Sequence, residues 1–220
     1  SGQPSLRGIP LRGLDGNLTR LDVLTLGGEQ VTLEGEVVPL SAGAVAVLGS
    51  LVLQPGQTRQ HLQAALYPDK FPNAAASAIK SHLAELRRHI PGEVVLTDGP
   101  YHARTYHLSG GFGVRLDLLE YRSALAQHNL VRALSLYRGP AFPGMTQSDW
   151  AEGLQLEART GLSLLAQQWA RAALHAGEPQ QALAICDQVL MVEPELVELH
   201  ELRLQAARQL GDVRLIAQYA

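Results

Sequence analysis

The sequence predicts an α+β domain followed by an all-α domain. Two observations support this prediction: short extended runs alternate with helical segments up to about residue 110, and nearly every later segment places apolar residues at helical spacing. The composition agrees, because 46% of the residues are hydrophobic and 18% are charged, a balance typical of folded chains. We expect an N-terminal tail over residues 1–20, a mixed domain over 21–110 and a helical domain over 111–220.

Three short strands should open the mixed domain. Residues 21–26, 31–33 and 37–40 are rich in valine, leucine and threonine, which favour extended structure. Gly35 lies between the last two runs and can adopt the positive φ that a tight hairpin requires. The pattern therefore predicts a small antiparallel sheet.

Two short helices should follow these strands. Ser41 is placed to cap a helix that ends at Leu53, before a Pro-Gly pair. Thr58 is placed to cap a second helix that ends at about Leu66, before another proline.

The sequence predicts a third helix over residues 74–90. Pro72 marks its start, and a second Pro-Gly pair follows its end. Steps of 100° per residue gather apolar side chains on one side of it: Ala75, Ile79, Leu83, Leu86 and Ile90. The opposite side gathers small polar groups and cations: Asn73, Ser77, Lys80, Ser81, Ala84 and Arg88, with Arg87 at the margin. The first side should face the core, and the second could enter a groove of DNA.

Two more strands, over residues 94–97 and 105–108, should form a terminal hairpin with His102 and Arg104 near its tip. Strands, three helices and such a hairpin together describe a winged helix-turn-helix.

The helical domain contains a candidate repeat. Gly177 and Gly211 lie 34 residues apart, and each follows an alanine-rich apolar helix. Ala173 and Ala207 share one phase of this repeat, and Pro194 falls where a repeat unit would end. A period of about 34 residues is that of tetratricopeptide repeats, so the sequence predicts a tetratricopeptide-like helical repeat domain.

Several short motifs, in this order, resemble the antibiotic-regulatory class of bacterial transcription activators. They are VTLEGEVVPL at 31–40, LYPDKFPNAAASA at 66–78, Leu-Arg-Arg at 86–88 and LSLYRGPAF at 134–142. Members of this class join an OmpR-like winged helix to a bacterial transcriptional activation domain, and the resemblance covers roughly residues 21–220.

The resemblance implies a transcription regulator that binds double-stranded promoter DNA and recruits RNA polymerase. The chain departs from the family at Ser77, where asparagine is usual, at Glu85, where a basic residue is usual, and at Thr105, where glycine is usual. The family's activation domain continues through further helices, whereas this chain stops at Ala220, so a truncated domain is expected. The helical domain should contact RNA polymerase or a second copy of the chain.

Ten residues are expected to contact DNA. Ser77, Lys80, Ser81 and Arg88 should reach base edges or nearby phosphates in the major groove. Two helix-start residues should hold a phosphate, and two hairpin residues should approach the minor groove or the backbone. The full set is Thr58, Arg59, Asn73, Ser77, Lys80, Ser81, Arg87, Arg88, His102 and Arg104.

The charge of the mixed domain leaves a second hypothesis open. Residues 1–110 contain nine lysines and arginines and nine aspartates and glutamates, so they carry no net charge. Strong binding to DNA usually requires a basic surface. The alternative is that the polar helix face is ordinary solvated surface, and that the chain is a protein-interaction module whose winged helix no longer binds DNA.

Other kinds of site have weaker support. His82, Glu85 and His89 lie near one another in helical phase, but their spacing is not that of a zinc helix, and we expect histidines beside a core face instead. Gly110, Gly111 and Gly113 lack the lysine of a phosphate-binding loop and are interpreted as a linker. We expect no metal site and no cofactor.

Enzymatic activity has no positive signal in the sequence. Cys186 lies in the apolar phase of its helix and is expected to be a buried structural thiol. Trp150 and Trp169 are expected to pack between helical repeats. A single cysteine, no apolar run of about 20 residues and no signal-like N-terminus favour a cytoplasmic protein without a membrane partner.

Overall fold

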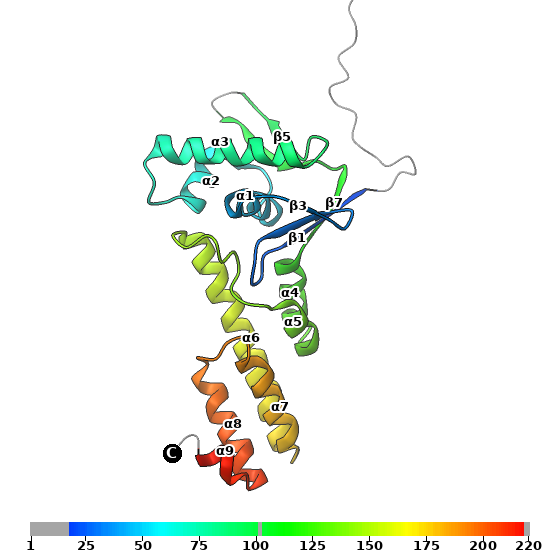
Figure 1. The fold of residues 1–220 in the computed structure, drawn as a ribbon, viewed down its shortest axis with the longest axis vertical. Helices are drawn as coiled ribbons and strands as arrows, with labels where there is room; N and C mark the ends of the chain where they lie inside the picture. The colour runs from blue at the N-terminus through cyan, green and yellow to red at the C-terminus, as the bar shows by residue number, and fades with distance from the viewer. Residues whose placement is uncertain (1–17, 101–102, 218–220) are drawn as a thin grey trace, which may run out of the picture. The chain divides into compact units, whose positions relative to one another are not determined.

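The computed structural model describes residues 18–100 and 103–217 and confirms a mixed α+β region followed by a helical one (Figure 1). The strands are β1 (Thr19–Leu24), β2 (Gln30–Leu33), β3 (Glu36–Val38), β4 (Gln57–Thr58), β5 (Val95–Asp98), β6 (Thr105–Leu108) and β7 (Phe112–Leu116). The helices of the mixed region are α1 (Ala42–Leu53), α2 (Arg59–Leu66) and α3 (Pro72–His89). Those that follow are α4 (Asp117–Ala126), α5 (Leu130–Leu136), α6 (Asp149–His175), α7 (Pro179–Leu190), α8 (Val197–Leu210) and α9 (Val213–Ala217).

The first sheet has the strand order β3-β2-β1-β7. The predicted hairpin joins β2 to β3, and both Glu34 and Gly35 adopt positive φ in its turn. Leu21, Val23 and Val31 are fully buried, so one face of the sheet contributes to the core. The richness of these runs in valine, leucine and threonine therefore identified the strands correctly.

The first three helices begin and end close to the predicted positions. Ser41 and Thr58 cap α1 and α2, because their side chains accept hydrogen bonds from the N–H groups of Ala44 and His61. The predicted core side of α3 is buried along its whole length: Ala75, Ile79, Leu83, Leu86 and Ile90. Helix α3 packs against α1 and α2, so all three helices contribute to the core of the mixed region.

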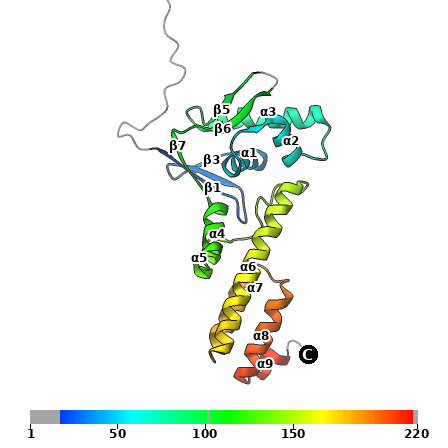
Figure 2. The same cartoon turned by 180° about the vertical axis from the view of Figure 1, so that it is seen from behind.

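The second sheet, in the order β4-β6-β5, contains the predicted hairpin. The hairpin β5–β6 lies beside α3 in both views of the fold (Figure 1 and Figure 2). The two-residue strand β4 pairs with β6 immediately before α2, so the start of α2 is fixed to the hairpin.

The predicted linker at Gly110–Gly113 is wrong at Gly113, which lies in β7. This strand runs parallel to β1, with Gly113 paired to Arg20. Phe112 and Leu116 are buried at its two ends. The glycine interrupts the apolar alternation, and the partner strand lies about 90 residues earlier, so no local pattern marks β7 as a strand.

Contacts divide the chain into two compact units. The first runs through Leu119 and also includes Phe142–Glu152, and the second consists of Glu120–Ala141 and the chain from Gly153 onward. Asp117 fixes the end of β1 within the first unit, since its buried carboxylate accepts hydrogen bonds from the N–H and hydroxyl groups of Thr25 and from the N–H of Leu26.

The second unit is built from helices joined by tight turns. Gly177 and Gly211 both adopt the left-handed conformation, with φ of 75° and 70°. After each turn the next N–H group returns to an alanine carbonyl five residues earlier, from Glu178 to Ala173 at 2.8 Å and from Asp212 to Ala207 at 3.0 Å. The two turns that suggested a repeat therefore have the same backbone geometry.

The tryptophans and the cysteine occupy different environments. Trp150 packs against Phe142 within the first unit, at 4.8 Å between ring centroids, so the prediction that it packs between repeats is wrong. Trp169 is 41% exposed, and its Nε1 donates to the carbonyl of His128 in the second unit. Cys186 is fully buried, as predicted, and burial raises the pKa of its thiol to about 11.

None of the helices within residues 18–100 and 103–217 is both long and apolar enough to cross a membrane.

Candidate nucleic-acid interface

Helix α3 presents a polar surface opposite its buried side. Pro72 begins the helix, and Arg87, Arg88 and His89 occupy its last turn, where cations are favoured by the helix dipole. We call the exposed predicted residues the α3 outer face: Asn73, Ser77, Lys80, Ser81, Ala84, Arg87 and Arg88. All seven side chains are solvent-exposed, so the outer face is available to a partner.

The start of α2 supplies the second part of the interface. Thr58 lies in β4 and uses its hydroxyl to accept the N–H of His61 at 3.2 Å. Arg59, the first residue of α2, is exposed. A phosphate at this position would therefore meet the side chain of Arg59, whereas the Thr58 hydroxyl is already used by the helix cap.

The hairpin supplies the third part. Arg104 and Tyr106 are two residues apart, and Tyr106 pairs with Thr97 across β5 and β6. The Arg87 guanidinium donates from Nη2 to Thr97 Oγ1 at 3.4 Å, so the last turn of α3 is connected to β5.

These three parts border a hollow of about 340 Å³, which we call the basic hollow. It is lined by Arg59, Lys80, Leu83, Arg87, Thr97, Arg104 and Tyr106. Four of these seven residues are cations, and they come from α2, α3 and the hairpin segment. Guanidinium and ammonium groups that meet in this way favour an anion such as a phosphate group.

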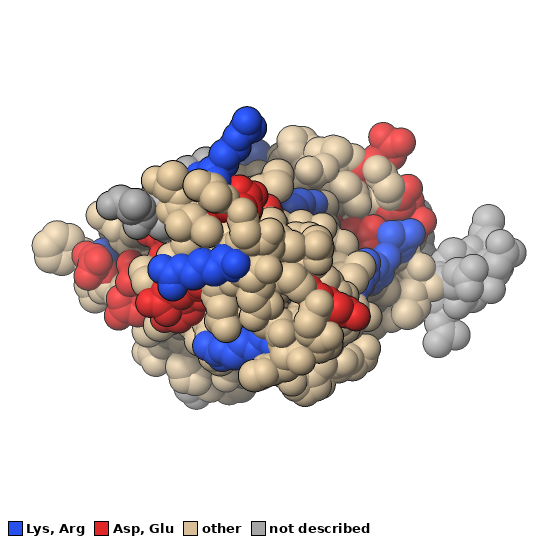
Figure 3. All heavy atoms as spheres, turned by 90° about the horizontal axis from the view of Figure 1, so that it is seen from below, with Lys and Arg blue, Asp and Glu red and all other residues tan. Residues whose placement is uncertain are grey.

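Two acidic groups of the first unit have partners of their own. Asp98 lies 3.5 Å from His107 on the hairpin, and Glu85 directs its carboxylate to Ser41 at the start of α1. Figure 3 shows the molecule from below, on a face where basic and acidic side chains are interspersed among uncharged ones. The basic hollow is thus a local concentration of positive charge in a domain without net charge.

The structure brings together some of the predicted DNA contacts. Four line the basic hollow: Arg59, Lys80, Arg87 and Arg104. Four others lie on the α3 outer face without lining the hollow: Asn73, Ser77, Ser81 and Arg88. His102 lies outside the described residues.

Three of the seven residues that line the hollow were not predicted to contact DNA: Leu83, which was assigned to the core, and Thr97 and Tyr106. The two-residue period of a strand places Tyr106 on the same side as Arg104, so this signal was present in the sequence. Thr97 could be found only after the register of the hairpin was known, because Thr97 and Tyr106 are cross-strand partners.

His82 and Glu85 have polar partners on other segments. His82 contacts Tyr67, and Glu85 accepts hydrogen bonds from Ser41. Within the part of the chain that the structure describes, three or more histidine, cysteine, aspartate or glutamate side chains do not gather in a group that could hold a metal ion.

Comparison with known proteins gives one family match. Residues 114–215 match the family described as "Bacterial transcriptional activator domain", which is a family of transcription regulators without enzymatic activity. This match confirms the resemblance to bacterial transcription activators. A search of curated proteins finds no match to the chain.

Among solved structures, the chain is similar to Mycobacterium tuberculosis EmbR in complex with a low-affinity phosphopeptide. The two share 22% sequence identity with a TM-score of 0.62, and the likeness covers 88% of this chain and 56% of the EmbR chain. At this identity the likeness shows a shared fold.

Proposed function

Because residues 114–215 match the bacterial transcriptional activator domain, we propose that the chain is an activator that binds promoter DNA through its first unit. In this proposal the first unit is a winged helix-turn-helix, with α2 and α3 as the helix pair and β5–β6 as the wing. The observation that carries the proposal is the basic hollow beside the α3 outer face.

The two surfaces have different tasks in DNA binding. Cations in the basic hollow hold the phosphate backbone and set the position of the protein on the duplex. The small side chains of the α3 outer face, such as Ser77 and Ser81, let the helix approach the bases closely, and Arg88 is suited to guanine. If each of the four hollow cations neutralises one phosphate, log K falls against log salt with a slope of about −3.6.

The second unit is proposed to carry the contacts with protein partners. Its repeated turns at Gly177 and Gly211 support a tetratricopeptide-like arrangement of helix pairs. We propose that it contacts RNA polymerase, with a second copy of the chain as the other candidate, in the cytoplasm. Two weak interfaces in one complex raise the effective concentration of each, which offsets the modest DNA affinity expected from a neutral domain.

The salt dependence of DNA binding tests the proposal. Fragments selected from genomic DNA with the full chain are labelled, and their affinity is measured by fluorescence anisotropy across a salt series. Arg87→Ala should weaken binding and make the slope shallower by about 0.9, because one phosphate contact is lost. Arg208→Ala, which removes an exposed cation from α8 in the second unit, is the matched control and should leave the slope unchanged.

The same measurement decides between the two hypotheses. Absence of binding at low salt would favour the interaction module whose winged helix no longer binds DNA, which the zero net charge of residues 1–110 supports. A second variant, Arg88→Ala, separates base recognition from charge, because it should relax the preference for the selected sequence more than it weakens binding to random DNA.

A further inference from the structure

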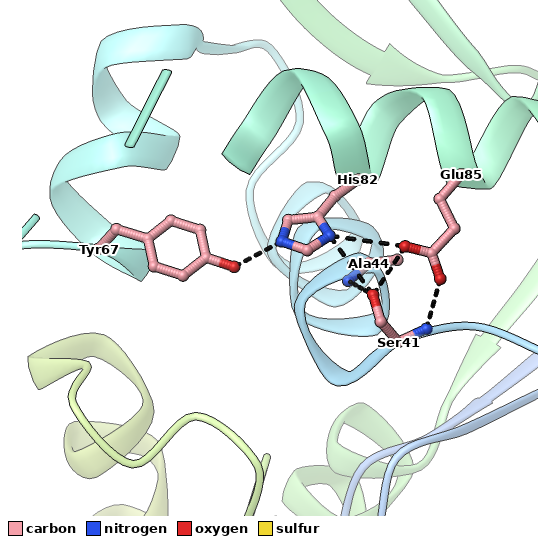
Figure 4. A network of polar contacts seen from close by, with 5 residues as sticks. All are labelled: Ser41, Ala44, Tyr67, His82 and Glu85. Atoms are coloured by element: carbon pink, nitrogen blue, oxygen red, sulfur yellow. Dashed lines mark hydrogen bonds and ion pairs between the residues drawn. The ribbon is translucent and has the colours of Figure 1, made fainter. Parts of the chain in front are cut away.

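A polar network connects the start of α1 with the middle of α3 (Figure 4). Glu85 accepts the N–H of Ser41 at 2.5 Å on one carboxylate oxygen and the Ser41 hydroxyl at 2.7 Å on the other. The Ser41 oxygen in turn accepts the N–H of Ala44 at 3.3 Å. The carboxylate of α3 thus completes the cap of α1, at a helix N-terminus that favours negative charge.

His82 lies one turn before Glu85 and extends the network to the end of α2. Its Nε2 is 2.7 Å from the Tyr67 hydroxyl, and its Nδ1 is 3.4 Å from Ser41 Oγ and 3.6 Å from Glu85 Oε2. We assign the proton of the neutral ring to Nδ1, the nitrogen on the side of Glu85, because an ionised carboxylate can only accept. Nε2 is then the acceptor for the Tyr67 O–H, and every polar group of the network is satisfied.

Gly43, in the first turn of α1, makes room for this arrangement. A Cβ atom at this position would lie 2.3 Å from His82 Nε2 and 2.6 Å from the Tyr67 hydroxyl oxygen. Any side chain at residue 43 would therefore displace the imidazole from Tyr67.

His82 and Glu85 lie on the flank of α3, between its buried side and its outer face. Glu85 is one helical turn from Ser81 and from Arg88, which are both on the outer face. A rotation of α3 that broke the bonds of Glu85 and His82 would turn the outer face by the same angle.

We propose that Tyr67, His82 and Glu85 are positioning residues that fix the rotation of α3 for DNA binding, and that they do so only while the His82 ring is neutral. This inference rests on the proposed function, since it assigns to the network the placement of the α3 outer face.

Protonation of His82 would disturb the network at Tyr67. A proton on Nε2 would point at the hydroxyl that now donates to it, so the Tyr67 O–H would have to turn away. The charged groups facing His82 are Glu85 on α3 and Lys70, whose Nζ lies 4.1 Å from the centre of the Tyr67 ring. Burial lowers the pKa of His82, with Lys70 acting in the same direction and Glu85 against it.

The sign of the pH effect follows from this shift. An unfolded chain or a rotated helix would release His82 to water, where it accepts a proton near its ordinary pKa of about 6.5. Acidification below about pH 6.5 therefore favours the state in which the network is broken, and DNA binding should weaken. A histidine that became protonated at the DNA interface itself would have the opposite effect, because the added positive charge would attract DNA.

The test is the pH profile of DNA affinity at constant salt, measured with the full chain between about pH 7.5 and about pH 5.5, on either side of the ordinary histidine pKa. We expect the wild-type affinity to fall at least about threefold over this range. His82→Gln, which keeps a neutral polar group, should not show this fall. His89→Gln, the same change seven residues later on α3, should follow the wild-type profile.

Tyr67→Phe provides a second variant in case His82→Gln does not fold. It removes the hydroxyl that donates to neutral His82 and should move the midpoint of the affinity loss to higher pH. An unchanged midpoint in Tyr67→Phe, or an acid loss in His82→Gln equal to that of the wild type, would overturn the positioning role alone. Wild-type protein that binds no DNA at any pH overturns the proposed function, and this inference with it.

Discussion

At the scale of single residues, two helical glycines have opposite surroundings. A Cβ atom at Gly49 in α1 would lie 2.6 Å from Cζ and 2.8 Å from Cε1 of Phe142, a fully buried ring. A Cβ atom at Gly153 in α6 would meet nothing within 4 Å. Packing against Phe142 requires glycine at residue 49. At residue 153 glycine has no such role and lowers the stability of the helix, because it loses more backbone entropy on folding than alanine would.

We therefore predict opposite effects of the same substitution. Gly49→Ala should lower the free energy of unfolding by about 1–3 kcal/mol, because the new methyl group would overlap the buried ring of Phe142 and force it to shift. Gly153→Ala should raise it by about 0.5–1 kcal/mol, since alanine favours the helix interior. Urea unfolding followed by circular dichroism measures both, and a stabilising Gly49→Ala would show that the core around Phe142 can relax.

At the scale of elements, the turn between α4 and α5 matches the two turns already described. His128 adopts a φ of 53°, its N–H reaches the carbonyl of Leu125, and the N–H of Asn129 reaches the carbonyl of Ala124. The offsets of three and five residues are those found at Gly177 and Gly211. Three helix pairs thus share one turn, and of these three turns only the one at His128 has a side chain at the left-handed position.

Replacing His128 by glycine should stabilise the second unit. The left-handed conformation costs a residue with a Cβ about 1–2 kcal/mol, and part of this gain is lost to the greater freedom of glycine in the unfolded chain. We predict that His128→Gly raises the free energy of unfolding by about 0.5–1 kcal/mol. Gly211→Ala is the converse control and should lower it by about 1 kcal/mol. A destabilised His128→Gly variant would show that the exposed imidazole makes a contact of its own.

The elements that the sequence predicted correctly are those specified by neighbouring residues. A glycine between two β-rich runs marks the β2–β3 turn, and Ser41 and Thr58 precede their helices at capping distance. The buried side of α3 follows from the helical period alone. In each case the signal lies within one helix or one hairpin, so no knowledge of the fold was needed.

The features that were missed depend on residues far apart in the chain. Strand β7 pairs with β1 across about 90 residues. Glu85 accepts a hydrogen bond from Ser41, the residue that caps α1, which lies 44 positions earlier in the chain. A carboxylate on a helix flank has many potential partners, and the tertiary arrangement of α1, α2 and α3 selects Ser41. The same holds for the basic hollow, where the cations were predicted but their convergence depends on how α2, α3 and the hairpin pack.

At the scale of the whole molecule, the two units are interleaved along the sequence. The first unit includes Phe142–Glu152, although 22 residues of the second unit, Glu120–Ala141, come before this segment. We call Phe142–Glu152 the returning segment, and three hydrogen bonds hold it to the rest of the first unit. The N–H of Phe142 donates to the carbonyl of Thr25, and the N–H of Gly144 donates to the carboxylate of Glu29. The Ser148 hydroxyl donates to the carbonyl of Ala65.

The returning segment should therefore be essential to the stability of the first unit. The ring of Phe142 is fully buried, stacks at an angle on Trp150 and fills the space beside Gly49. Phe142→Ala in the full chain should lower the free energy of unfolding by about 3–5 kcal/mol, because it leaves a cavity in the core. The control is Met191→Ala, at a methionine that is 83% exposed: it removes apolar atoms without opening a cavity and should change stability by less than about 0.5 kcal/mol. Urea unfolding of both variants makes the comparison, and equal losses of stability would contradict the role of Phe142.

Truncation of the chain is a second test of whether the first unit needs the returning segment. A fragment that stops at Leu119 contains all the described strands of both sheets but lacks the returning segment, whereas a fragment that stops at Glu152 retains it. We predict that the shorter fragment unfolds at lower urea concentration than the longer one, because the surface of α1 around Gly49 and the groups that bind Phe142, Gly144 and Ser148 lose their partners. Equal midpoints for the two fragments would show instead that the first unit folds without residues 142–152, and that its boundary lies at the end of β7.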